Sequence, residues 1–143
     1  MILGLAFSFG IPIAFASQNN LSLITWVIFL ANFLWVIAYD TVYGMIDAAD
    51  DEKLNIGNSA RYFGRRKEKW VFLLGLAHLF IYFFVGLSLN IDLSFFFFLS
   101  LCFGIVFFQN FQINLGLRQI YLSIFKGNNW IGVFLFFGIL FGF

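Results

Sequence analysis

Five long apolar stretches, separated by short polar segments, constrain the fold of this chain more than any single motif does. Each is close to the ~17 to 25 residues that a helix needs to cross a bilayer. Because 62% of the 143 residues are hydrophobic and only 10% are charged, a soluble domain could not bury the apolar surface. The sequence therefore predicts one all-α integral membrane bundle over residues 1–143. Its about five transmembrane helices are expected near residues 1–17, 21–39, 70–89, 94–117 and 129–143.

The basic residues indicate how the bundle is oriented. All eight follow the second or the fourth apolar stretch, at Lys53, Arg61, Arg65, Arg66, Lys67, Lys69, Arg118 and Lys126. By the positive-inside rule, residues 44–69 are expected to form a cytoplasmic loop. Asn58 or Ser59 is suited to cap a short interfacial helix of about two turns within it, with Gly64 near its end. The net charge of +1 gives no reason to expect a nucleic-acid partner.

Four carboxylates stand at the end of the second apolar stretch, where acidic residues are least expected. On a continuous helix, with about 100° per residue, Asp40, Asp47 and Asp51 lie within roughly 60° of one another, and Asp50 points about 80° away. Such a face suits a hard cation such as Mg²⁺, which takes a few carboxylates together with substrate phosphates and water. The spacing therefore favours a divalent-cation site, and the alternative is a solvated acidic loop.

The segment from Trp35 to Lys53, followed by residues 56–64, resembles the second aspartate-rich region of the UbiA prenyltransferase superfamily. Within the superfamily, it is most similar to the 4-hydroxybenzoate polyprenyltransferases, and the similarity extends to residues 4–12 and 125–132. The resemblance implies the second half of a bundle of about nine helices. The first aspartate-rich motif is absent from these 143 residues, so we expect a C-terminal half that needs a complementary N-terminal half.

The resemblance also implies a chemistry. Asp47 and Asp51 would hold Mg²⁺, which binds the diphosphate of a polyprenyl donor. The ring carbon ortho to the hydroxyl of 4-hydroxybenzoate would attack the resulting allylic cation, as a step of ubiquinone biosynthesis in the bacterial inner membrane. Asp40 would order a lysine, a water or the outer shell of the metal, and Tyr43 would flank the cation.

Three further residues are candidates for contact with the substrates. Lys53 follows the carboxylates directly and is the better candidate for a catalytic cation that also binds the diphosphate. Arg61 would either bind the diphosphate or anchor lipid headgroups. Asn32 lies within an apolar stretch, so it would either contact substrate or make an interhelical hydrogen bond.

The 24 phenylalanines invite a different interpretation, a tunnel for the isoprenoid tail. Consecutive residues point around the whole helix, so we expect most of Phe95–Phe98, Phe107, Phe108 and Phe111 to face lipid.

Two other classes remain open at this stage. A transporter should place ionisable residues near the middle of the bilayer, whereas these carboxylates lie at one end of a stretch. A non-catalytic assembly subunit, or a UbiA-type enzyme with another acceptor, is compatible with the same sequence.

Overall fold

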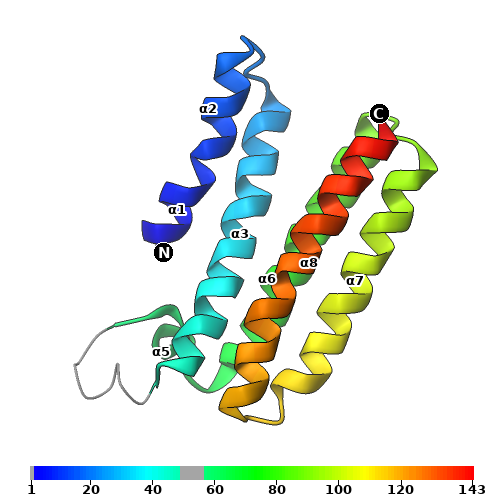
Figure 1. Ribbon diagram of the computed structural model, residues 1–143. Helices are drawn as coiled ribbons and strands as arrows, with labels where there is room; N and C mark the ends of the chain where they lie inside the picture. Colours follow the sequence, from blue (N-terminus) through cyan, green and yellow to red (C-terminus); the bar gives the residue numbers. More distant parts are fainter. Residues whose placement is uncertain (1, 49–56) are drawn as a thin grey trace.

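The computed structural model describes residues 2–48 and 57–143, and every regular element in these ranges is a helix (Figure 1). The elements are α1 (Ile2–Ser8), α2 (Gly10–Ser17), α3 (Leu23–Ile46), α5 (Ser59–Phe63), the 3₁₀ turn η1 (Gly64–Arg66), α6 (Lys67–Ser88), α7 (Leu93–Ile113) and α8 (Arg118–Gly142). In the described ranges four helical segments are long and apolar enough to cross a membrane: α3, α5 with α6, α7 and α8. The predicted helical membrane bundle is confirmed, and its first apolar stretch forms the shorter pair α1 and α2.

Helix α3 occupies the centre of this arrangement and contacts α1, α2, α5, α6 and α8. Figure 1 shows that α3 and α7 end, and α6 and α8 begin, at the same end of the bundle, beside α5. The basic residues of α5, η1 and the start of α8 therefore gather at one end, as their sequence positions predicted. The side of the membrane on which this end lies stays a prediction.

The helix boundaries differ from the hydropathy pattern in three regions of the chain. Helix α8 begins at Arg118, well before residue 129, because polar residues of its first turns lower the local hydropathy without interrupting the helix. Helix α3 runs to Ile46 and α6 starts at Lys67, so both edges of the predicted 44–69 loop are helical. The first stretch breaks at Phe9, since Pro12 has no N–H for the carbonyl of Ser8.

The packing of α6, α7 and α8 centres on Phe95, whose side chain is only 1% exposed. Its ring fits against Gly86 of α6 and Gly138 of α8, and its Cβ lies against Gly142 of α8, where small residues allow the helices to approach closely. The other phenylalanines expected to face lipid mostly do so, since Phe97, Phe107, Phe108 and Phe111 are exposed. Phe95 departs from that expectation because glycines on two neighbouring helices make room for it.

We predict that Gly86→Ala destabilises the bundle by about 1 to 3 kcal/mol, the usual cost of overpacking a tight core. An added Cβ would lie 2.6 Å from Cε1 of the buried Phe95 ring. Gly104→Ala is the matched control, because a Cβ there meets nothing within 4 Å. Thermal unfolding in detergent measures both variants, and equal midpoints would contradict the packing argument.

Candidate functional site

A chain of hydroxyl groups connects the carboxylate of Asp40 to the interior. The Ser59 hydroxyl, on α5, donates to Oδ2 of Asp40 at 3.2 Å, and the Thr41 hydroxyl lies 3.0 Å from Oγ of Ser59. The Thr41 hydroxyl also donates to the carbonyl of Ile37 at 2.7 Å. Both hydroxyl residues are buried, whereas Asp40 is half-buried. One oxygen of Asp40 is therefore held by α5.

Helix α5 is fixed on α3 by its N-cap, Asn58. The side-chain oxygen of Asn58 accepts from the backbone N–H of Arg61 at 2.7 Å, and its Nδ2 donates to the carbonyl of Gly44 at 3.4 Å. A Cβ on Gly44 would lie 3.0 Å from Cγ of Asn58, so the close approach depends on glycine. Gly64 follows the helix with a φ of 56°. Of the two candidate caps, Asn58 is the one that caps the helix, and the predicted end near Gly64 is confirmed.

A cavity of about 430 Å³ opens between α1, α3 and α8, and we call it the aromatic cavity. It is lined by Phe7, Trp35, Val36, Tyr39, Asp40, Tyr43, Phe125 and Asn129. The rings of Tyr39 and Phe125 stack with centroids 4.2 Å apart, and that of Tyr43 lies 5.4 Å from Phe125. This volume and the aromatic walls are typical of a site for a small organic ligand.

On the α5 side, a second hollow of about 530 Å³, the polar pocket, is lined by Asp40, Gly57, Asn58, Ser59, Arg61 and Tyr62. Asp40 borders both this pocket and the aromatic cavity. One carboxylate therefore separates an apolar space from a space that contains a guanidinium group. This arrangement suits a ligand with an apolar body and an anionic end.

Asp47 forms the C-cap of α3, with φ −97° and ψ 6°. The assumption of one continuous helix fails at Asp47, because α3 ends at Ile46, and Asp51 lies outside the described residues. Arg118 of α8 caps this end: its Nε donates to the carbonyl of Ile46 at 3.1 Å, and its Nη2 lies 4.0 Å from Oδ1 of Asp47. Sequence analysis had used Arg118 only as a sign of orientation.

Several predicted residues are not brought together in the described part of the chain. Asp51, Asp50 and Lys53 lie outside the described residues. Nδ2 of Asn32 donates to the Ser8 hydroxyl at 3.0 Å, which is the interhelical bond that sequence analysis gave as its alternative. Within residues 2–48 and 57–143, no three His, Cys, Asp or Glu side chains cluster as a metal site would require.

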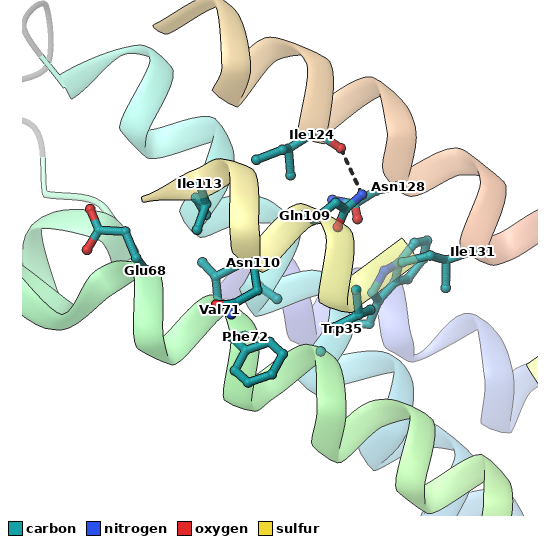
Figure 2. A pocket seen from close by; sticks show the side chains of 13 residues that line it. Trp35, Glu68, Val71, Phe72, Gln109, Asn110, Ile113, Ile124, Asn128 and Ile131 are labelled. Carbon is teal, nitrogen blue, oxygen red and sulfur yellow. Dashed lines mark hydrogen bonds between the residues drawn. The ribbon is translucent and has the colours of Figure 1, made fainter. Parts of the chain in front are cut away.

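A third space lies inside the bundle between α3, α6, α7 and α8, and Figure 2 shows its lining. Polar side chains of Gln109, Asn110 and Asn128 line it, and Gln109 Nε2 donates to the carbonyl of Ile124 at 3.5 Å. Its volume of about 20 Å³ holds roughly one water molecule. The interior pocket is therefore too small for a substrate.

Sequence analysis assigned no role to Ser59, Phe125 or Asn129, although the structure places all three around Asp40 or in the aromatic cavity. For the last two a signal was present, because residues 125–132 carried part of the family resemblance. The only signal for Ser59 was that it and Asn58 were the two candidate caps of the short helix. Its contact with α3 depends on the course of the chain between α3 and α5, which the local sequence does not give.

The model of the UbiA prenyltransferase family matches residues 1–119. The 4-hydroxybenzoate octaprenyltransferase of Tolumonas auensis is 37% identical over 141 residues, which cover 98% of this chain and 49% of that protein. The proteins of the same name from Vibrio cholerae serotype O1 and Burkholderia ambifaria are 40% and 39% identical, over 98% and 96% of this chain and 50% and 48% of their own. The chain thus spans about half the length of the curated relatives it matches. No solved structure matches it.

We predict that Asn58→Ala loosens the contact between α5 and α3. The variant loses the cap bond to Arg61 and the bond to Gly44, and losing a cap costs about 1 kcal/mol. The backbone amide of Arg61 should then exchange its hydrogen roughly five times faster. Asn20→Ala is the control, because that side chain is exposed at the other end of the bundle. Unchanged exchange in Asn58→Ala would contradict the capping role.

Proposed function

The chain belongs to the UbiA prenyltransferase family, and we propose that it forms part of a 4-hydroxybenzoate polyprenyltransferase. The enzyme would move a polyprenyl group from a polyprenyl diphosphate to the ring carbon ortho to the hydroxyl of 4-hydroxybenzoate. The proposal places this integral membrane protein in a bacterial inner membrane, with the end of the bundle that carries α5 on the cytoplasmic side.

The observation that carries the proposal is the position of Asp40 between the two hollows. An isoprenoid diphosphate has an apolar tail and an anionic end, and 4-hydroxybenzoate is an aromatic ring with polar substituents. The aromatic cavity offers stacked rings to the apolar parts, and Arg61 in the polar pocket offers hydrogen-bond donors to an anion. Tyr43, in the aromatic cavity, supplies a ring face that would stabilise a nearby allylic cation.

Mg²⁺ is part of this proposal, with Asp47 and Asp51 as its protein ligands. Asp47 fits the role by its chemistry: its carboxylate oxygens are hard donors, and it accepts no hydrogen bond from a side chain in the described part of the chain. When bound, Mg²⁺ would neutralise charge on the diphosphate. Arg118 lies beside Asp47 and supplies a further positive charge at the same end of α3.

The residues of this chain would act on the two substrates in distinct ways. Lys53 and Arg61 would bind the diphosphate, so that the carbon–oxygen bond to the prenyl group breaks and pyrophosphate leaves. The ring carbon then forms the new bond, and the ring loses its proton. Asp40 stands at the boundary of the two hollows, and its carboxylate would accept that proton.

The chain covers about half of its relatives, so a complementary N-terminal half is proposed as its partner, within the lipid bilayer. The alternative is that the chain is a non-catalytic subunit, and a chain that spans half the length of its relatives is equally compatible with that role. Membranes containing the chain alone, and membranes containing it with a complementary N-terminal half, should be supplied with geranyl diphosphate, Mg²⁺ and 4-hydroxybenzoate. We expect the prenylated product only with both halves. No product in either case would refute the proposal, and product from another aromatic acceptor would reassign the substrate.

We predict that Asp47→Ala and Asp51→Ala each lower turnover more than about 100-fold, as loss of a metal ligand should. Insertion into the membrane should be unchanged, because both residues follow the apolar span of α3. Asp50→Ala is the control within the same segment, since Asp50 stands outside the Asp-x-x-x-Asp spacing. Comparable losses at all three positions would argue against a site built on that spacing.

A further inference from the structure

We propose that Ser59 is a positioning residue for Asp40, holding one carboxylate oxygen so that the other is presented to the aromatic acceptor. This inference rests on the proposed function and adds a residue to it. The bond from Ser59 Oγ to Oδ2 of Asp40, at 3.2 Å, is its starting point. Among the described residues, Oδ1 of Asp40 receives no hydrogen bond, so this oxygen remains available.

The direction of the Ser59 bond follows from the number of protons. A serine hydroxyl has one proton, and an ionised carboxylate only accepts, so that proton lies between Ser59 and Asp40. The Thr41 hydroxyl lies 3.0 Å from Oγ of Ser59, and its own single proton is shared between that oxygen and the Ile37 carbonyl, 2.7 Å away. Both hydroxyl residues are buried, at 6% and 0% exposure, and Ser59 borders the polar pocket together with Asp40. The Ser59 proton is therefore directed at Asp40, because an ionised carboxylate is a stronger acceptor than the Thr41 hydroxyl oxygen.

The two hydroxyl residues next to Asp40 both lie on helices that are held in place. Thr41 lies on α3 itself, one residue after Asp40, and its hydroxyl is also within 2.7 Å of the Ile37 carbonyl. Ser59 is the first residue of α5, next to the Asn58 cap that fixes α5 against Gly44. A carboxylate held on one side by a fixed donor cannot rotate freely about its Cβ–Cγ bond. Its second oxygen is thereby kept in one place, which is what a proton acceptor for a bound ring needs.

The experiment compares Ser59→Ala, Ser59→Thr and the control Ser100→Ala, in membranes that contain the chain and any partner half that activity needs. Ser100 bonds only a carbonyl on the exposed side of α7. With geranyl diphosphate, Mg²⁺ and 4-hydroxybenzoate, Ser59→Ala should lower kcat about tenfold with little change in KM. Ser59→Thr should recover most of kcat, because it restores the hydroxyl.

Epistasis with Asp40 separates positioning from a purely structural role. In the background of Asp40→Asn, adding Ser59→Ala should change kcat by less than about twofold, since the group that Ser59 orients has already been altered. A full tenfold loss in that background, or an unchanged kcat in Ser59→Ala alone, would overturn the inference while leaving the proposed function intact.

A second measurement does not depend on turnover. Thermal unfolding of Ser59→Ala, Asp40→Asn and the double variant should be non-additive, because the two side chains share one hydrogen bond. Additive shifts in the midpoints would overturn the contact and with it the positioning role. If the wild type forms no prenylated product, the proposed function fails and the catalytic part of this inference fails with it, whereas non-additive unfolding would still support the contact.

Discussion

Hydrogen bonds from α3 to its neighbours hold the candidate site together. In lipid, apolar burial provides little force between helices, so packing and interhelical hydrogen bonds must supply it. Asn32 of α3 donates such a bond to Ser8 of α1, and His78 of α6 donates from Nδ1 to the carbonyl of Ala31. Ser59 connects α5 to Asp40, and Arg118 connects α8 to Ile46. These four neighbours are thus tied to α3 at three levels along its length: α1 and α6 at residues 31–32, α5 at Asp40 and α8 at Ile46.

This arrangement explains why the polar residues of α3 are distributed as they are. Asn32 and the carbonyl of Ala31 lie deep in the span and serve only to join helices, in keeping with the cost of an unpaired polar group in lipid. Asp40 and Asp47 lie towards the end of the helix where basic side chains gather, and there the partners are a hydroxyl group and a guanidinium group. The polar groups of α3 that only join helices are therefore separated along the helix from those that belong to the candidate site.

The sequence predicted what depends on neighbouring residues and missed what depends on distant ones. The apolar spans, the Asn58 cap and the lipid-facing phenylalanines follow from local pattern, because composition and capping act within a few residues. The contact of Ser59 with Asp40 joins residues 19 apart, and that of Arg118 with Ile46 joins residues 72 apart. Both depend on the course of the chain between helices. The burial of Phe95 likewise depended on glycines of other helices.

The charges at the end of α3 bear on the metal and the basic residues of the proposed site. The last carbonyls of a helix carry the negative end of its dipole, and Asp47 adds a carboxylate there. This field attracts a cation and repels a bare diphosphate. Arg118 neutralises part of it by taking the Ile46 carbonyl, and Arg61 adds positive charge in the polar pocket. An anionic substrate is therefore accommodated at this end only if cations lie between it and α3, which is the arrangement that Mg²⁺ on Asp47 and Asp51 would complete.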